Sequence, residues 1–264
     1  MKKLFLATAL AALLMPVAAA AQSPFEGTWK MNLNNVNFPK KPDVYLLQNG
    51  MYSCKTCIPP HTIKADGMDQ QIAGDPYIDT MAVEVVNDHE IRVTDKKNGK
   101  IVATATDILS PDGNTLTRDV SDSSATNGGP PVTSKSEEVR VAKGPAGSSL
   151  LSGSWRTTKI ESVSDNGGVF TYRVGGDELT MTSPTGQTYT AKFNGPEAPM
   201  KGDPGTSSVQ LKLIGKNTLE ETDFRDGKVI SVSKMTVAPD GKTADATVHD
   251  PRDNTTATFQ LMKQ

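Results

Sequence analysis

Motifs in the first half of this chain recur in the second half at a nearly constant spacing. Gly27-Thr28-Trp29 recurs as Gly153-Ser154-Trp155, 126 residues later. Four further pairs lie 128 residues apart: Thr62-Ile63-Lys64 and Thr190-Ala191-Lys192, Gly74-Asp75-Pro76 and Gly202-Asp203-Pro204, Asn98–Val102 and Asp226–Ile230, and Pro111-Asp112-Gly113 and Pro239-Asp240-Gly241. Shared turn chemistry explains a single Asp-Gly match but not a common spacing. The sequence therefore predicts a tandem duplication of one structural unit.

A Pro/Gly/Ser-rich segment separates the two predicted units. Residues 144–149 read Gly-Pro-Ala-Gly-Ser-Ser, a composition typical of linkers that few contacts cross. We therefore expect a first β unit over residues 22–143 and a second β unit over residues 150–264. Each unit would contain about 120 residues, which is enough to bury a core of its own.

The first 21 residues have the pattern of a secretory signal peptide. Lys2 and Lys3 precede an apolar run from Leu4 to Leu14, and Pro16 precedes the small residues Ala19–Ala21. This order predicts cleavage near Ala21 and a periplasmic or secreted protein. The apolar run is too short for the roughly 20 residues of a membrane span, so no membrane span is expected.

Within each unit, apolar residues recur with the period of two that is typical of half-buried strands. Val209, Leu211 and Leu213 alternate with polar residues, as do Ile91 and Val93. These runs end at Asn-Gly, Asp-Gly and Gly-Gly turns, which favour consecutive antiparallel hairpins. Closure of such a meander removes its exposed edges. The predicted fold class is all-β, with two tandem antiparallel up-and-down barrels or curved meanders.

The opening of each unit resembles a motif of two known families. Gly27 and Trp29 in the first unit, and Gly153 and Trp155 in the second, form a Gly-x-Trp pattern similar to the start of lipocalins and fatty-acid-binding proteins. That resemblance implies a lipocalin-like barrel in which the tryptophan closes one end and the interior holds a small apolar ligand. These four residues are accordingly expected to have a structural, barrel-opening role.

A second resemblance extends over most of both units. Residues 27–34, Phe38-Pro39, residues 189–195 (Tyr-Thr-Ala-Lys-Phe-Asn-Gly) and residues 238–243 are similar to blocks found in exported bacterial proteins of unknown function. The resemblance implies export and the β fold. It supplies no catalytic residues and no activity.

Cys54 and Cys57 are the only cysteines in the chain. At a spacing of 128 they align with residues 182–185, where Ser-Pro indicates a turn between strands. In an exported protein we therefore expect a structural disulfide that joins the two sides of a tight turn. Two alternatives remain: a redox dithiol, which Pro59-Pro60 disfavours because a helix N-terminus would not follow, and a metal site that recruits His61.

No other motif in the sequence points to catalysis. A Gly-x-Ser-x-Gly elbow and a Gly-rich phosphate loop are both absent from the sequence, and the three histidines have no histidine counterpart in the other unit. We therefore predict no catalytic residues, no metal ligands and no cofactor, and we favour a binding protein over an enzyme. A net charge of −2 disfavours a nucleic-acid partner.

Three functions follow from this pattern, in order of preference. The first is a non-enzymatic binding protein of the cell envelope or the secreted fraction, with a small apolar ligand inside a β barrel as its partner. The second is a structural or interaction protein whose barrels are filled by their own side chains, with the loop Ser121–Pro131 as an exposed candidate surface. The third is a redox or metal site at Cys54 and Cys57. The interior volume separates the first two, because a ligand needs a cavity of several hundred Å3.

Overall fold

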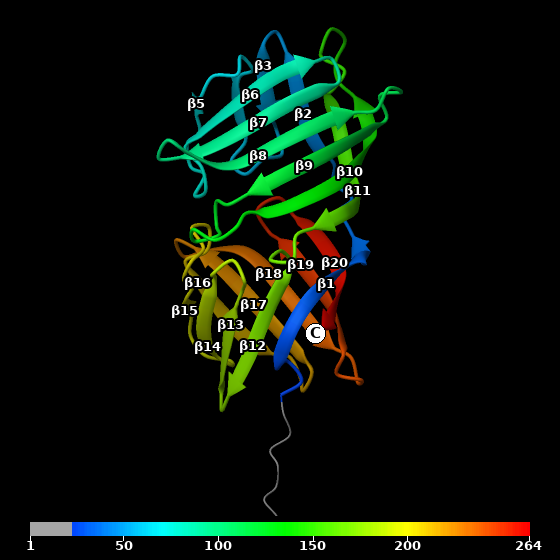
Figure 1. The fold of residues 1–264 in the computed structure, drawn as a ribbon. Helices are drawn as coiled ribbons and strands as arrows, with labels where there is room; N and C mark the ends of the chain where they lie inside the picture. Colours follow the sequence, from blue (N-terminus) through cyan, green and yellow to red (C-terminus); the bar gives the residue numbers. More distant parts are fainter. Residues whose placement is uncertain (1–22) are drawn as a thin grey trace, which may run out of the picture.

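The computed structural model describes residues 23–264, and these residues form strands and turns without any helix (Figure 1). The predicted all-β class is confirmed. The predicted signal peptide and its cleavage site lie outside the described residues. Within residues 23–264, no helix is long and apolar enough to cross a membrane.

Twenty strands form two antiparallel sheets of ten strands each, and each sheet curves into a nearly closed barrel. We call the sheet that contains β2–β11 the first barrel and the sheet that contains β1 and β12–β20 the second barrel. The strands of the first barrel, in sheet order, are β4 (His61–Lys64), β3 (Met51–Cys54), β2 (Asp43–Gln48), β11 (Gly153–Val163), β10 (Val132–Lys143), β9 (Thr115–Asp122), β8 (Lys100–Leu109), β7 (Glu90–Lys97), β6 (Thr80–Asn87) and β5 (Gln70–Gln71). The strands of the second are β14 (Thr188–Lys192), β13 (Glu178–Thr182), β12 (Val169–Gly175), β1 (Gly27–Asn37), β20 (Thr255–Lys263), β19 (Thr243–Asp250), β18 (Lys228–Val237), β17 (Thr218–Arg225), β16 (Ser208–Leu213) and β15 (Ala198–Pro199).

The two barrels exchange their opening strands. β1 does not pair with β2, which follows it in the chain, but lies between β12 and β20 in the second barrel. β11 in turn lies between β2 and β10 in the first barrel. The division at residues 144–149 expected from the sequence therefore differs from the division of the sheets, because each half of the chain supplies one strand to the other barrel.

The two exchanged strands meet similar partners at their opening glycines. Gly27 pairs with Tyr172 in the second barrel, and Gly153 pairs with Tyr45 in the first. Each Gly-x-Trp strand thus meets a tyrosine of the neighbouring strand in a matching register. The partners of the two tryptophans differ, because Trp29 pairs with Phe170 and Trp155 pairs with Asp43.

The tight turns follow the sequence pattern. Asn98-Gly99 closes the β7–β8 hairpin with φ angles of 51° and 74°, and Asp226-Gly227 closes the β17–β18 hairpin with φ angles of 52° and 74°. Two successive positive φ values give the turn that matches the twist of a hairpin, and Asn-Gly and Asp-Gly adopt them most readily.

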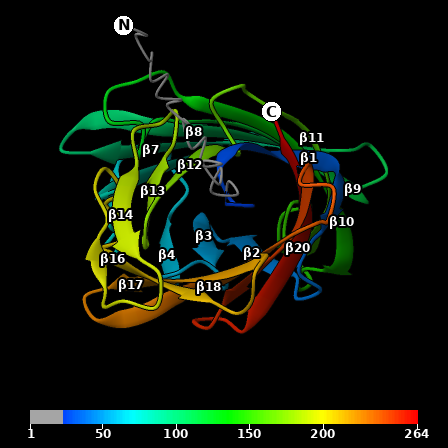
Figure 2. The same ribbon diagram turned by 90° about the horizontal axis from the view of Figure 1, so that it is seen from below.

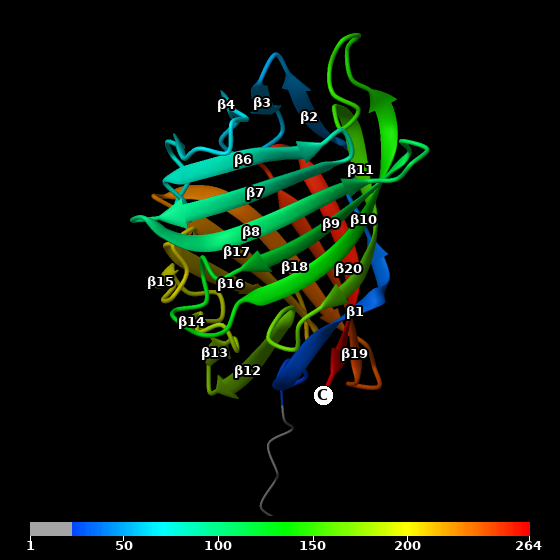
Figure 3. The ribbon, with the colours of Figure 1, turned by 45° about the horizontal axis from the view of Figure 1, so that its top comes forward.

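The barrels are stacked end to end, so that the view from below in Figure 2 looks along the second barrel, and the tilted view in Figure 3 shows both. Residues 38–42 and 164–168, which follow the exchanged strands, cross the junction. Direct hydrogen bonds join loops of the two barrels there, among them one from the Tyr77 hydroxyl to Asp203 Oδ1 at 2.8 Å.

Each opening tryptophan is fully buried in the core of the barrel that contains its strand. The indole nitrogen of Trp29 donates to the Phe25 carbonyl at 2.8 Å, and the Lys263 ammonium lies 4.8 Å from the centre of the ring. Trp155 repeats this arrangement with the Leu151 carbonyl at 3.0 Å. The Arg140 guanidinium lies 4.0 Å from its ring. A cation over an indole face adds electrostatic attraction to the burial of the ring.

Candidate functional site

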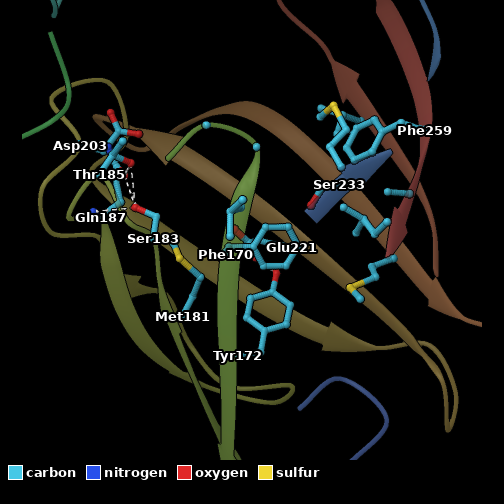
Figure 4. A pocket seen from close by; sticks show the side chains of 18 of the residues that line it. Phe170, Tyr172, Met181, Ser183, Thr185, Gln187, Asp203, Glu221, Ser233 and Phe259 are labelled. Carbon is cyan, nitrogen blue, oxygen red and sulfur yellow. Dashed lines mark hydrogen bonds between the residues drawn. The ribbon is translucent and has the colours of Figure 1, made fainter. Parts of the chain in front are cut away.

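The interior of the second barrel contains a cavity of about 440 Å3 (Figure 4). Its walls are largely apolar side chains from strands on several sides of the barrel, and they include four methionines. The principal apolar lining residues are Met31, Phe170, Met181, Met200, Met235, Ala246, Val248, Phe259 and Leu261. Cavities of this size and character accommodate small molecules, and the flexible thioether side chains of methionine adapt to the shape of what they enclose.

One wall of this cavity is polar. Glu221 lines the cavity from β17, and its Oε2 accepts hydrogen bonds from the hydroxyls of Tyr172, at 3.4 Å, and Tyr189. In Figure 4, Phe170, Tyr172 and Glu221 lie together on one side of the cavity. Burial, together with the nearby Asp223 carboxyl, raises the pKa of Glu221 to about 8. Burial and Glu221 also raise the pKa of both tyrosines well above the ordinary value.

The interior of the first barrel is filled instead by an ion-pair cluster. The Arg118 guanidinium donates to Asp107 through two nitrogens, at 2.7 and 2.8 Å. Its third nitrogen donates to the Tyr45 hydroxyl at 3.1 Å and lies 3.3 Å from Glu138. The internal space that remains beside Tyr45 and Asp107 is only about 10 Å3, which is too small for a ligand.

The strand registers show that the ion-pair cluster of the first barrel and part of the cavity wall of the second are formed by residues at corresponding positions. In the first barrel Asp107 pairs with Arg118, and in the second Met235 pairs with Ala246 at the same rung. On the next strand of each barrel, Glu138 in the first corresponds to Leu261 in the second. Two carboxylates and a guanidinium in one barrel are thus replaced by a methionine, an alanine and a leucine in the other, and the replacements line the cavity.

A second pair of corresponding residues carries buried carboxyl groups in both barrels. Asp95 pairs with Met81, and Asp223 pairs with Val209 at the same rung of the second barrel. The Oδ1 atom of each aspartate is buried without a hydrogen-bond partner. Burial raises the pKa of Asp95 to about 7 and that of Asp223 to about 6. In the second barrel this carboxyl lies next to Glu221, whereas the residue that corresponds to Glu221 in the first barrel is Val93.

The loop between β9 and β10 reaches the rim of the cavity. Asn127 Nδ2 donates to the carbonyls of Thr185 and Gly202, both at 2.9 Å, and Gln187 Nε2 donates to the Ala125 carbonyl. Thr185, Gln187 and Asp203 form the polar rim of the cavity at the left of Figure 4. The sequence predicted that residues 121–131 form an exposed loop. Residues 127–131 are exposed, but Thr126 is buried and the loop is anchored to the second barrel.

Cys54 and Cys57 form the predicted disulfide, with Cα atoms 5.5 Å apart on either side of Lys55 and Thr56. Cys54 is the last residue of β3, and residues 55–59 form bends rather than a helix. His61 pairs with Cys54 across the strands, and its ring lies 6.3 Å from that of Tyr52. Among residues 23–264, no three or more His, Cys, Asp or Glu side chains converge in a way that could hold a metal ion.

No known family model matches this chain, and a search of curated proteins finds no significant match either. The resemblance of the Gly-x-Trp openings to lipocalins therefore stays a prediction. The residues that distinguish the second barrel, above all Glu221 and Ala246, were not singled out from the sequence. One signal was present in the sequence. Glu221 lies on the same, inward face of its strand as the apolar Leu219. In the first barrel the two corresponding residues, Ile91 and Val93, are both apolar, so Glu221 is a charged residue at a position where an apolar one is expected.

Proposed function

We propose that this protein binds one small, largely apolar molecule inside its second barrel, and that the first barrel is a filled structural counterpart. The observation that carries the proposal is the cavity of about 440 Å3 in the second barrel, set against about 10 Å3 at the corresponding place in the first. Apolar walls supply the free energy of binding, and a few polar groups fix the orientation of the ligand.

Two sequence features support the same interpretation, that of a non-enzymatic carrier in the periplasm or outside the cell. These are the resemblance of the opening motifs to lipocalins and the predicted signal peptide. Of the functions considered from the sequence, the filled-barrel alternative applies to the first barrel, where the Arg118 cluster takes up the interior. The redox or metal alternative at Cys54 and Cys57 concerns the first barrel as well, because both cysteines belong to its β3–β4 connection.

The direct test is binding of an environment-sensitive apolar dye such as N-phenylnaphthylamine. Ala246 lines the cavity, so Ala246→Phe fills it and should abolish the increase in dye fluorescence. Thr247 is the next residue of β19 and points to the opposite face of the sheet, so Thr247→Phe is the matched control and should bind dye as the unmodified protein does.

Native mass spectrometry of the protein, purified from the cells that produce it, complements the dye experiment. A co-purified molecule that is lost in Ala246→Phe supports the proposal. Protein that is bare in several preparations and does not take up the dye would overturn it and favour an interaction protein.

A further inference from the structure

We propose that the ligand of the second barrel is a small apolar molecule with a basic amine, and that Glu221 holds its ammonium group. This inference rests on the proposed binding function and specifies the chemistry of the ligand. It is based on the charged residues that line the cavity, on the hydrogen bonds around Glu221, and on the ion pairs of Arg118 in the first barrel.

The cavity has acidic groups but no cationic side chain to balance them. Glu221 and Asp203 contribute the carboxyl groups that line it. The one basic residue among the lining residues is Lys234, but its ammonium bridges Glu220 at 3.3 Å and its side chain is 48% exposed. Because neighbouring residues of a strand point to opposite faces, Lys234 lies on the outer face while Ser233 and Met235 face inward.

The hydrogen bonds around Glu221 leave a place for a donor. The two tyrosine hydroxyls both donate to Oε2 of Glu221. The Asp223 carboxyl lies beside it on the same face of β17, with a buried Oδ1 that has no partner. An ammonium group offers three donors and no acceptor, and its charge would favour the ionised form of Glu221, which burial disfavours in the empty barrel.

The first barrel shows how this fold compensates buried carboxylates. Arg118 places a guanidinium between Asp107 and Glu138 inside that barrel. The residue that corresponds to Arg118 in the second barrel is Ala246, whose short side chain leaves the space open. A cationic ligand would therefore supply in the second barrel what Arg118 supplies in the first.

Two other head groups fit the cavity less well. A fatty-acid carboxylate would bring a further negative charge into an acidic interior without a cation, and burial of an unpaired charge is costly. A neutral alcohol would form a hydrogen bond with Glu221 but would not gain the charge-assisted contact that an ammonium group forms with the ionised carboxylate. The expected order of affinity is therefore amine, then alcohol, then carboxylate.

The test is competition for the bound dye by octylamine, octanol and octanoate, which share the same alkyl chain. We expect octylamine to displace the dye at concentrations at least about tenfold below those of octanoate, with octanol in between, because a charge-assisted hydrogen bond in a buried site exceeds a neutral one. In Glu221→Gln, which keeps the shape of the side chain, the concentrations of octylamine and of octanol that displace half of the bound dye should become equal.

Each other outcome has a defined meaning. Octanoate or octanol that competes as well as octylamine would overturn the inference, and so would an unchanged preference in Glu221→Gln. Dye binding without competition by octylamine would overturn the inference and leave the proposed function standing. Failure of the unmodified protein to bind the dye at all would instead count against the proposed function.

Discussion

The two barrels share a strand order and differ in what fills them. Each is built from ten strands around a buried opening tryptophan, and each has at the same rung an aspartate, Asp95 or Asp223, whose Oδ1 atom is buried. The first barrel holds an ion-pair cluster around Arg118, whereas the second holds a cavity and Glu221. The framework therefore accommodates either interior, and the two interiors differ at inward positions that include Asp107 and Met235, Arg118 and Ala246, and Glu138 and Leu261.

Under the proposed function, this contrast assigns stability to one barrel and binding to the other. A buried ion pair contributes little net stability by comparison with apolar packing, but removal of one partner is strongly destabilising. The first barrel is thus committed to its own side chains. The second leaves apolar walls unfilled, which sacrifices packing in that barrel and provides a place for a ligand.

The largest effect is expected from substitutions in the two exchanged strands. Trp29→Ala should lower the free energy of unfolding by about 3–5 kcal/mol, because it removes a fully buried aromatic side chain. Since β1 belongs to the second barrel, amide hydrogen exchange should accelerate in β12 and β20 and not in β2 and β10.

Trp155→Ala is the matched variant for that experiment. Its tryptophan is equally buried, but β11 belongs to the first barrel, so faster exchange should appear in β2 and β10. The opposite assignment, in which each variant loosens the barrel of its own half of the chain, would show that the opening strands are not exchanged.

A comparable effect is expected when the ion-pair cluster of the first barrel is broken. Arg118→Ala leaves Asp107 and Glu138 buried without their cation and should cost about 3–5 kcal/mol at neutral pH, measured by denaturant unfolding. The triple variant Asp107→Met, Arg118→Ala and Glu138→Leu, which copies the second barrel, should recover much of that loss. An Arg118→Ala variant as stable as the unmodified protein would contradict the inferred burial of the cluster.

The buried aspartates predict a smaller, pH-dependent effect. Both aspartates have a folded-state pKa above the unfolded value of 3.8. The contribution of such a group to stability is fully present below pH 3.8. It is lost as the pH rises through the folded-state pKa. For Asp95 that loss continues to about pH 7, and for Asp223 it ends near pH 6.

Substitution of each aspartate by asparagine distinguishes their contributions to the pH dependence of stability. Asp95→Asn should reduce the decline in stability between pH 5 and pH 8 by roughly 1–3 kcal/mol, measured by urea unfolding across that range. Asp223→Asn should reduce the decline in the lower part of the range, and it should also reduce the decline up to about pH 8, because the Asp223 carboxyl helps to raise the pKa of Glu221. A slope that neither substitution alters would show that these carboxyl groups titrate normally in the folded protein.

The smallest effect is expected from the disulfide. Replacement of both Cys54 and Cys57 by serine should reduce stability by about 2 kcal/mol or less, because the closed loop is short. Dye binding should not change, since the disulfide lies in the first barrel and the cavity in the second. A loss of binding in this double variant would reveal coupling between the barrels that the structure does not account for.

The sequence predicts the features that depend on neighbouring residues. Alternation of polar and apolar residues, Asn-Gly and Asp-Gly turns and the spacing of Cys54 and Cys57 are local, and the structure contains the strands, the turns and the disulfide that they indicate. The strand exchange is not local. Alternation predicts which face of a strand is buried, but it does not predict which of the two barrels an opening strand joins.

The position of the cavity could not be predicted from the sequence either, because it also depends on contacts between distant residues. Met235, Ala246 and Leu261 each resemble an ordinary core residue, and Asp107, Arg118 and Glu138 each resemble a surface charge on a strand. Only the register of neighbouring strands brings each set together inside a barrel. The same holds for the aromatic residues Phe170, Tyr172 and Phe259, which the fold places around one cavity.

The stoichiometry of octylamine binding, measured by isothermal titration calorimetry on the unmodified protein and on two variants, tests the difference between the barrels most directly. The unmodified chain should bind one molecule, and Ala246→Phe should bind none. The triple variant Asp107→Met, Arg118→Ala and Glu138→Leu should gain a second, weaker site, because it opens the first barrel without supplying a counterpart of Glu221. Two sites in the unmodified chain, or one site that persists in Ala246→Phe, would contradict the assignment of binding to the second barrel.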